Sequence, residues 1–177
     1  MNRPSLFALA AAFLALPACS TLDQQPVEQL AVANLARANG APAGTVELVA
    51  TGNHLSLVVS ATGLPQGMHG FHLHTTGACT APDFTSAGGH LNPANNSHGT
   101  MSPGGSHLGD LPNLEVGGSN VTSTTIDLSD TDRAQILAWL FDADSTAVVI
   151  HRGPDDYRTD PAGNAGPRIA CGVLNRT

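Results

Sequence analysis

Short apolar segments with a period of two residues, each closed by turn residues, recur along most of this chain. The segments 45–50 and 54–61 each place apolar residues on one face, and Thr51, Gly52 and Asn53 separate them. Neighbouring side chains in a strand point to opposite faces, so this alternation is typical of strands that are buried on one side. Gly and Pro are abundant, with 19 and 12 residues, and aromatic residues make up only 4%. The pattern predicts antiparallel strands joined by turns rather than a helical bundle.

We expect about eight such strands in one all-β domain. An eight-stranded antiparallel Greek-key barrel or sandwich accommodates strands of this length and spacing. Two long stretches, 75–113 and 152–167, are rich in Gly and Pro and do not fit strands. Loops of this length in a compact domain are usually functional. The expected strands are 30–36, 45–50, 54–61, 68–74, 121–128, 136–141, 147–151 and 169–174.

The N-terminus is typical of an export signal. Asn2 and Arg3 give a short positive start, and residues 6–16 form an apolar stretch of signal-peptide length. The stretch closes on Leu-Pro-Ala-Cys, which resembles a bacterial lipobox and would make Cys19 the lipidated first residue of the mature chain. Ser20 does not resemble the aspartate that retains lipoproteins in the inner membrane, so we expect a periplasmic, outer-membrane-anchored lipoprotein. The alternative is an ordinary secretory signal that is cleaved nearby. We therefore interpret residues 1–19 as signal peptide, 20–28 as a tether and 29–177 as the folded domain.

Charge and cysteine content indicate which partners to exclude and which cross-link to expect. The formal net charge is −7, and all seven basic residues are arginine. The chain lacks the basic stripe of a nucleic-acid-binding protein, so we expect no nucleic-acid partner. With Cys19 assigned to the signal, Cys79 and Cys171 remain as a pair. Two distant cysteines in one small exported domain are usually bridged, and we expect a disulfide here.

The histidines carry the strongest functional signal. Six of the eight occur in an ordered series with one aspartate: His72, His74, His90, His98, His107, Asp110 and His151. His72 and His74 lie two residues apart on an expected strand, so both side chains point to the same face. Imidazole nitrogen suits copper and zinc, and a carboxylate oxygen also suits zinc. Seven ligands fill two four-coordinate sites only if one histidine is shared, and the spacing leaves open which one it is.

Five stretches resemble the copper-zinc superoxide dismutase family. Residues 67–74 (GMHGFHLH) resemble its copper-ligand strand, and residues 85–93 (TSAGGHLNP) resemble the segment with its bridging histidine. Residues 97–99 (SHG) and 106–113 (SHLGDLPN) resemble its zinc loop. Residues 163–173 (GNAGPRIACGV) resemble its C-terminal segment. The resemblance covers the chain from about Val27 to the end, with all motifs in the family's order.

The resemblance implies the fold described above, with the two long loops forming the metal site, and one copper and one zinc per chain. Superoxide is the implied substrate, and alternating reduction and oxidation of copper would yield oxygen and hydrogen peroxide. Arg168 is implied to guide the anion, His90 to bridge the metals and carry a proton, and Asp155 to link a copper histidine to a zinc histidine. The Cys79–Cys171 disulfide is a family feature as well. The implied copper ligands are His72, His74, His90 and His151, and the implied zinc ligands are His90, His98, His107 and Asp110.

Some alternatives stay open at this point. A non-catalytic extracytoplasmic protein that binds copper and zinc would carry many of the same residues. The loop 152–167 is shorter than in the familiar cytosolic enzymes and has no lysine, so steering of an anion would rest on Arg152, Arg158 and Arg168. The remaining histidines, His54 and His69, are interpreted as a surface residue and a structural residue. The sequence leaves open whether the protein is a monomer or a homodimer.

Overall fold

The computed structural model describes residues 25–128 and 132–177. The predicted signal peptide with Cys19 and the first part of the expected tether lie outside these residues. The first strand begins at Val27, slightly ahead of the expected start of the folded domain. Among the described residues, no helix is long and apolar enough to cross a bilayer. The strands of this part are β1 (Val27–Arg37), β2 (Pro42–Thr51), β3 (His54–Thr62), β4 (Gly67–His69), β5 (Phe71–His74), β6 (Leu114–Val116), β7 (Val121–Leu128), β8 (Ala147–His151), β9 (Arg168–Val173) and β10 (Asn175–Arg176), accompanied by the helix α1 (Arg133–Leu140) and a 3-10 turn at Thr85–Ala87.

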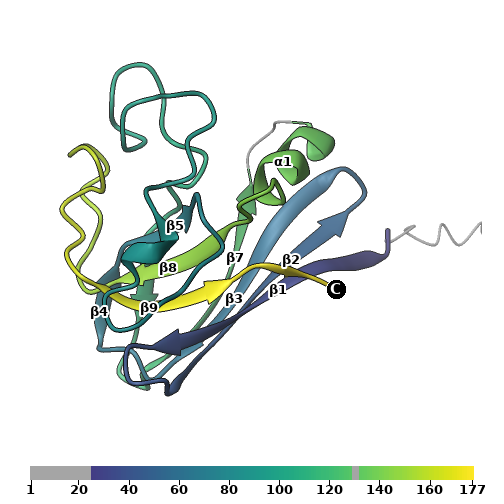
Figure 1. Cartoon of the computed structure of the whole chain (residues 1–177). Helices are drawn as coiled ribbons and strands as arrows, with labels where there is room; N and C mark the ends of the chain where they lie inside the picture. Colours follow the sequence, from purple (N-terminus) through teal and green to yellow (C-terminus); the bar gives the residue numbers. More distant parts are fainter. Residues whose placement is uncertain (1–24, 129–131) are drawn as a thin grey trace, which may run out of the picture.

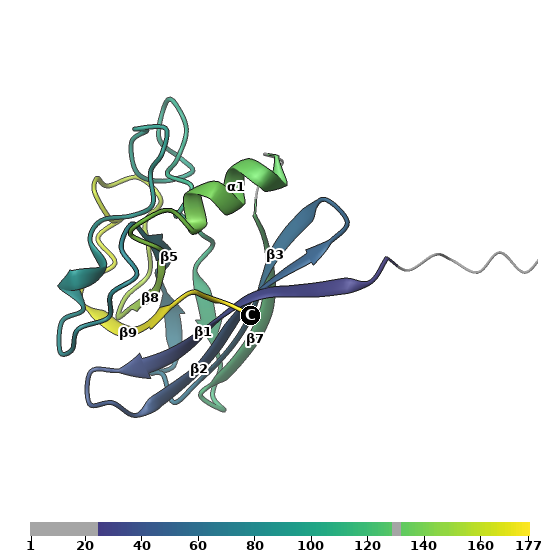
Figure 2. The same ribbon diagram turned by 45° about the vertical axis from the view of Figure 1, so that its right-hand side comes forward.

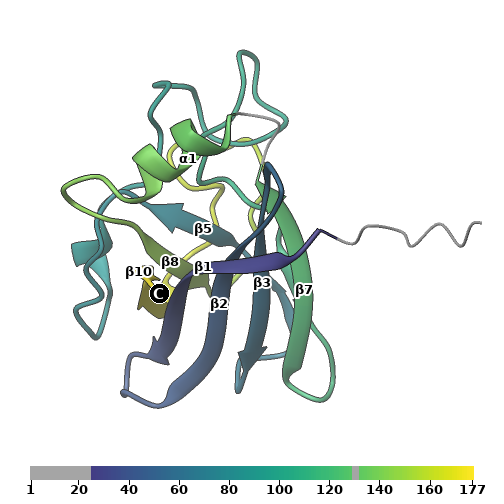
Figure 3. The same cartoon turned by 90° about the vertical axis from the view of Figure 1, so that its right-hand side faces the viewer.

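An eight-stranded antiparallel sheet curls around the core, which confirms the predicted fold class. Its strand order is β5-β8-β9-β1-β2-β3-β7, and β10 pairs with β1. Figure 3 shows β1, β2, β3 and β7 side by side across one face. A small second sheet pairs β4 with β6. Because β4 is followed directly by β5 and β6 lies beside β7, the small sheet connects the two ends of the large one.

The two-residue period of the strands places their apolar side chains in the core, as predicted. Three directly opposed pairs of buried side chains join β2 to β3, namely Val46–Val59, Leu48–Leu57 and Ala50–Leu55. On β5, Phe71 and Leu73 belong to the same apolar core. His72 and His74 alternate with these two residues and therefore face the opposite side of the strand, toward the long loops.

One expected strand is wrong. Residues 136–141 (ILAWLF) belong mostly to α1, which covers Arg133–Leu140. The Asp132 side chain accepts a hydrogen bond of 3.0 Å from the Ala134 backbone N–H and so caps the first turn of the helix. Ile136 and Leu140, four residues apart, are the buried residues of this helix. A short apolar run fits a buried strand or a helix equally well, and the capping aspartate is the signal that distinguishes them.

The expected strand 68–74 is interrupted at Gly70. The Gly70 N–H donates to Gly153 O and its carbonyl accepts from the His151 N–H, each at 2.8 Å. These bonds turn the backbone away from β6, so β4 pairs with β6 while β5 pairs with β8. The interruption keeps the two histidines of β5 next to the end of β8.

The two long loops lie next to one another at one end of the sheet, beyond β5 and β8 (Figures 1 and 2). Residues 75–113 lack regular structure apart from the 3-10 turn, as expected, and so do residues 152–167. Hydrogen bonds join the loops: the Met101 N–H donates to Tyr157 O at 3.1 Å, and the Asn113 N–H donates to Tyr157 Oη at 2.9 Å. The loops therefore act as one layer over the histidine face of the sheet.

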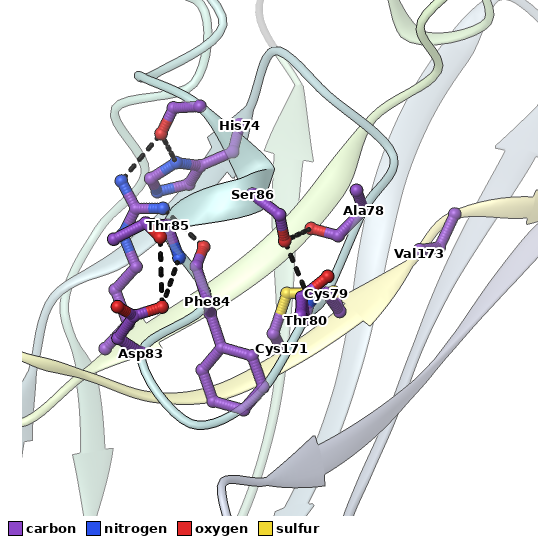
Figure 4. Close-up of a disulfide and its surroundings, with 12 residues drawn as sticks. His74, Ala78, Cys79, Thr80, Asp83, Phe84, Thr85, Ser86, Cys171 and Val173 are labelled. Carbon is purple, nitrogen blue, oxygen red and sulfur yellow. Dashed lines mark hydrogen bonds between the residues drawn. A yellow bond between two sulfur atoms is a disulfide. The ribbon is translucent and has the colours of Figure 1, made fainter.

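A disulfide fixes the first of these loops to the sheet. Cys79 in the loop is bonded to Cys171 on β9, as the cysteine count predicts (Figure 4). Around it, the Ser86 hydroxyl donates to Ala78 O and accepts from the Thr80 N–H. Cys171 and Phe84 belong to one small buried apolar cluster, so the cross-link and its packing hold the loop to the sheet.

We expect the double variant Cys79→Ala/Cys171→Ala to lose stability in its metal-free form. The bond joins residues 92 positions apart, and closing a loop of that length stabilises a folded chain by about 4–5 kcal/mol in the chain-entropy model. Urea unfolding of the metal-free protein measures the loss, and the reduced wild type should match the variant. A loss below about 1 kcal/mol would contradict the role given to the cross-link.

Candidate metal centre

Six histidines and one aspartate, all predicted as metal ligands, are buried in one place. Each is at most 8% exposed. Their ligand atoms form two overlapping groups, within each of which all atoms lie within 4.8 Å of one another. The first group is His72, His74, His90 and His151, and the second is His90, His98, His107 and Asp110.

The first group brings together three elements of the fold. His72 and His74 come from the outward face of β5, and His151 ends the neighbouring strand β8. His90 comes from the long loop and reaches this position because its backbone pairs with that of His74 in an isolated bridge. The register of β5 against β8 and of the loop against β5 therefore decides the geometry of the group.

In the first group, one nitrogen of each of three rings is fixed by an acceptor. His72 Nε2 lies 2.7 Å from Asp155 Oδ2, His74 Nδ1 lies 3.0 Å from Gly88 O, and His151 Nδ1 lies 2.8 Å from Gly166 O. A carboxylate or carbonyl oxygen only accepts, so these ring nitrogens carry the hydrogen. The opposite nitrogens then present lone pairs, which is the form that binds a metal.

Buried atoms without partners point to the same conclusion. Within the described residues, seven buried side-chain nitrogen or oxygen atoms have no hydrogen-bond partner, and five of them are ring nitrogens of these histidines. The five are His72 Nδ1, His74 Nε2, His90 Nε2, His98 Nδ1 and His151 Nε2. Leaving buried polar atoms unpaired is unfavourable. A copper ion would satisfy the four nitrogens of the first group, and imidazole is a suitable ligand for it.

The second group converges on a single oxygen. Asp110 Oδ1 lies 2.7 Å from His90 Nδ1, 3.0 Å from His98 Nδ1 and 3.0 Å from His107 Nδ1. The other oxygen, Oδ2, accepts from the backbone N–H groups of Gly99 and His107, which fixes the orientation of the carboxylate.

A cation fits between these atoms. His98 Nε2 donates to Asp155 Oδ1 at 2.9 Å, so His98 Nδ1 is a lone pair that faces a carboxylate oxygen. His98 Nδ1 and Asp110 Oδ1 are therefore two acceptors only 3.0 Å apart, and they repel one another unless a cation lies between them. Three imidazoles and one carboxylate are a suitable tetrahedral donor set for zinc.

His90 belongs to both groups, as the ligand count requires. Its Nδ1 faces Asp110 and its Nε2 faces the first group. The sequence spacing left the bridging residue open, and the family resemblance implied His90. The two groups that the structure forms share this one residue.

The Asp155 carboxylate connects the two groups by hydrogen bonds to one histidine of each. Its two oxygens accept from His72 and His98, one from each group. Its backbone is held in turn by the Asn113 side chain, which donates to Asp155 O at 2.9 Å and accepts from the Asp155 N–H at 2.8 Å. A Cβ at Gly163 would lie 1.8 Å from Asp155 Oδ1, so only glycine fits there. Metal-bound histidines commonly donate their second N–H to a carboxylate in this way.

The protonation states favour metal binding at neutral pH. Burial, aided by the nearby His90, lowers the pKa of His74 to about 2. Burial likewise lowers the pKa values of His90 and His151 to about 4 each. Burial of Asp110 opposes its ionisation, but hydrogen bonds from His90 and from backbone N–H groups outweigh that effect and lower its pKa to about 2. At pH 7 these three imidazoles are therefore neutral and the Asp110 carboxylate is charged.

Arg168 lies at the edge of the first group. Its Nη1 donates to Phe84 O and its Nη2 donates to Gly88 O, each at 2.6 Å. Gly88 O also accepts from His74 Nδ1, so one carbonyl joins the guanidinium to a histidine of the group. Figure 4 shows Phe84 and His74 beside the disulfide loop that supplies both carbonyls.

Sequence reasoning missed the backbone carbonyls of Gly88 and Gly166, which accept from His74 and His151. A backbone acceptor leaves no signal in residue type.

The two histidines outside the groups behave as expected. His69 is buried, and its ring nitrogens lie 2.8 Å from His151 O and from Pro65 O. It therefore fixes the backbone at the end of β8. His54 is exposed at the start of β3.

The chain is similar to proteins of one family. Residues 42–174 match the family model described as copper/zinc superoxide dismutase. Superoxide dismutase [Cu-Zn] 1 of Aquifex aeolicus is 42% identical over 144 residues, which cover 80% of this chain and 85% of the relative.

Solved structures agree with this match. A double mutant of a SOD-like protein from Bacillus subtilis matches with a TM-score of 0.76 at 39% identity, covering 84% of this chain and 99% of that one. The Cu/Zn superoxide dismutase from Brucella abortus matches with a TM-score of 0.65 at 27% identity over the same shares. The family model matches most of this chain, and the chain forms both ligand groups. This chain therefore belongs to the copper/zinc superoxide dismutase family.

Proposed function

We propose that this protein converts superoxide into oxygen and hydrogen peroxide. Copper would be held by His72, His74, His90 and His151, and zinc by His90, His98, His107 and Asp110. The observation that carries the proposal is the convergence of buried, unpartnered ring nitrogens on one point, with His90 shared between two groups.

The reaction consumes two superoxide anions and two protons and yields one oxygen and one hydrogen peroxide. When bound, copper supplies a one-electron redox couple, whereas zinc has no redox chemistry and stabilises the loop. The residues of the chain must therefore do two things. They attract and orient a small anion, and they supply a proton to the reduced product.

Arg168 is the residue that we assign to the anion. Its guanidinium is fixed by the carbonyls of Phe84 and Gly88 at 2.6 Å, so its charge is held in place beside His74. A guanidinium stays charged at any working pH and offers several donors in one plane. Fixed donors aimed at a developing negative charge need no rearrangement during the reaction.

His90 is the residue to which we assign the proton. Its Nδ1 stays in the second group while its Nε2 is free of protein partners. A proton held at Nε2 lies next to the position of the reduced product. Histidine is the side chain that most often transfers a proton in enzymes, and Nε2 faces the first group, where the product would form.

We assign the protein to an extracytoplasmic compartment, with Cys19 lipidated and anchored in the outer membrane. The disulfide supports an oxidising compartment. A relative that is 35% identical over 170 residues is named extracellular superoxide dismutase of Caenorhabditis elegans. The apolar stretch before Leu-Pro-Ala-Cys supports export and lipidation.

The variant His151→Ala should lose copper-dependent dismutase activity by more than about 100-fold, because it removes one nitrogen from the first group only. Zinc binding should persist, since His151 does not belong to the second group. Dismutase assays and metal analysis measure both effects, with the exposed His54→Ala as control. A wild type that binds both metals but turns over no faster than free copper would contradict the enzyme and favour a metal-storage protein.

The variant Asp155→Asn should weaken binding of both metals by about 10–100-fold, because an amide cannot accept from both His72 and His98 as the carboxylate does. Competition with a chelator measures each affinity. The matched control is Asp156→Asn, an exposed neighbour whose side chain bonds only within its own loop. Equal losses in the two variants would show that the loop, and not the link between the groups, is responsible.

The variant Cys19→Ser should leave the membrane fraction, because the lipidated residue is absent. Membrane fractionation and mass spectrometry of the mature N-terminus measure this. A wild type that is found unlipidated in the soluble fraction would contradict the anchor and leave the dismutase proposal untouched.

A further inference from the structure

A cavity of about 730 Å³ lies next to the first histidine group without containing any of its ligands. It shares Gly166 and Arg168 with the surroundings of that group. Its volume is in the range of small-molecule sites in proteins. Much of its lining is aliphatic: Leu64, Pro65, Pro82, Pro167 and Ile169.

Three arginines line the same cavity. They are Arg37 at the end of β1, Arg152 after β8 and Arg168 on β9. One carboxylate, Asp83, accompanies them, so the lining carries a net charge of +2 in a chain whose net charge is −7. Three of the seven basic residues of the chain therefore gather around one aliphatic cavity.

The charges of these three arginines are not neutralised by ion pairs. Within the described residues none of the three forms an ion pair, whereas Arg133 lies 3.0 Å from Glu28. Arg37 donates through Nη1 to Gly63 O at 3.0 Å, while its Nε is buried without a partner. The Asp83 carboxylate accepts from the N–H and hydroxyl of Thr85 through Oδ1. Arg168 already donates to Phe84 O and Gly88 O, so the donors left for a ligand are those of Arg152 and the second terminal nitrogen of Arg37. The cavity thus offers positive charge without an ion-pair partner, and donors from two arginines.

We propose that this cavity binds an organic carboxylate with an aliphatic body. The carboxylate would bind between the guanidinium groups of Arg37 and Arg152, and the aliphatic part would lie along Leu64 and the prolines. Guanidinium matches carboxylate in a planar, two-point hydrogen-bonded pair. The site goes beyond the proposed dismutase activity and does not depend on it.

The aliphatic lining distinguishes this ligand from a small inorganic anion. A diatomic anion such as superoxide fills little of the cavity and gains nothing from Leu64 or Ile169. A free phosphate would use the arginines only. An aliphatic carboxylate uses both, because its charge is paired while its chain buries apolar surface.

Calorimetric titration of the protein with octanoate tests the proposal, in both the metal-loaded and the metal-free form. Octanoate should bind at one site per chain in both forms. Acetate, which keeps the charge, and 1-octanol, which keeps the chain, should each bind at least about tenfold more weakly. Because binding is measured directly, an inactive protein would leave this result interpretable. Octanoate that binds no more tightly than acetate would overturn the proposal and leave only anion steering.

Arginine variants locate the site. Arg37→Gln and the exposed Arg152→Gln should each weaken octanoate binding about tenfold or more, because each removes a charge-assisted hydrogen bond. The control is Arg158→Gln, which removes the same charge from the loop that also holds Arg152, at a residue that does not line the cavity. Equal weakening in all three variants would mean a general charge effect and would overturn the site. The thermal midpoint of Arg37→Gln checks that this variant is folded. If it is not folded, octanoate binding by Arg152→Gln alone tests the site.

Discussion

Burying imidazole rings without leaving their nitrogens unpaired is the constraint on which the rest of this structure depends. Each of six histidines is at most 8% exposed, and each ring has two nitrogens to satisfy. The protein supplies an acceptor for one nitrogen of His72, His74, His98 and His151 and leaves the other as a lone pair. Without cations the arrangement carries five unpartnered buried nitrogens. Metal binding is therefore built into the hydrogen bonding of the fold and is not an addition to it.

The acceptors come from the long loops, so the loops must be as well fixed as the strands. Gly88 lies in the loop that the disulfide holds, and Gly166 and Asp155 lie in the loop after β8. Asn113 holds Asp155 through two hydrogen bonds and thereby joins the end of one loop to the first part of the other. Ordering such long segments costs conformational entropy. The cross-link and the metals offset that cost at the positions where geometry matters most.

Local patterns predicted the fold well where one face of a strand is buried. The segments 121–128 and 147–151 coincide with β7 and β8, because strand alternation or β-branched residues mark them. The segment 136–141 failed because its apolar residues suit either state, and tertiary packing of Ile136 and Leu140 decides for a helix. In the site, the ligand series is visible because histidines at fixed spacing are rare. Which histidine bridges, and which carbonyls orient the rings, depends on loop register that no local pattern encodes.

Arg168 shows why a lysine would not serve at the edge of the metal centre. Its guanidinium reaches two carbonyls at once, Phe84 O and Gly88 O, and the second of these also orients His74. An ammonium group is a compact point charge on a flexible stem and lacks the planar fork that spans two fixed acceptors. Phe84 packs with the disulfide, so the cross-link, the cation and a copper-group histidine form one connected unit. A charge fixed by two backbone carbonyls in this way keeps its position beside His74.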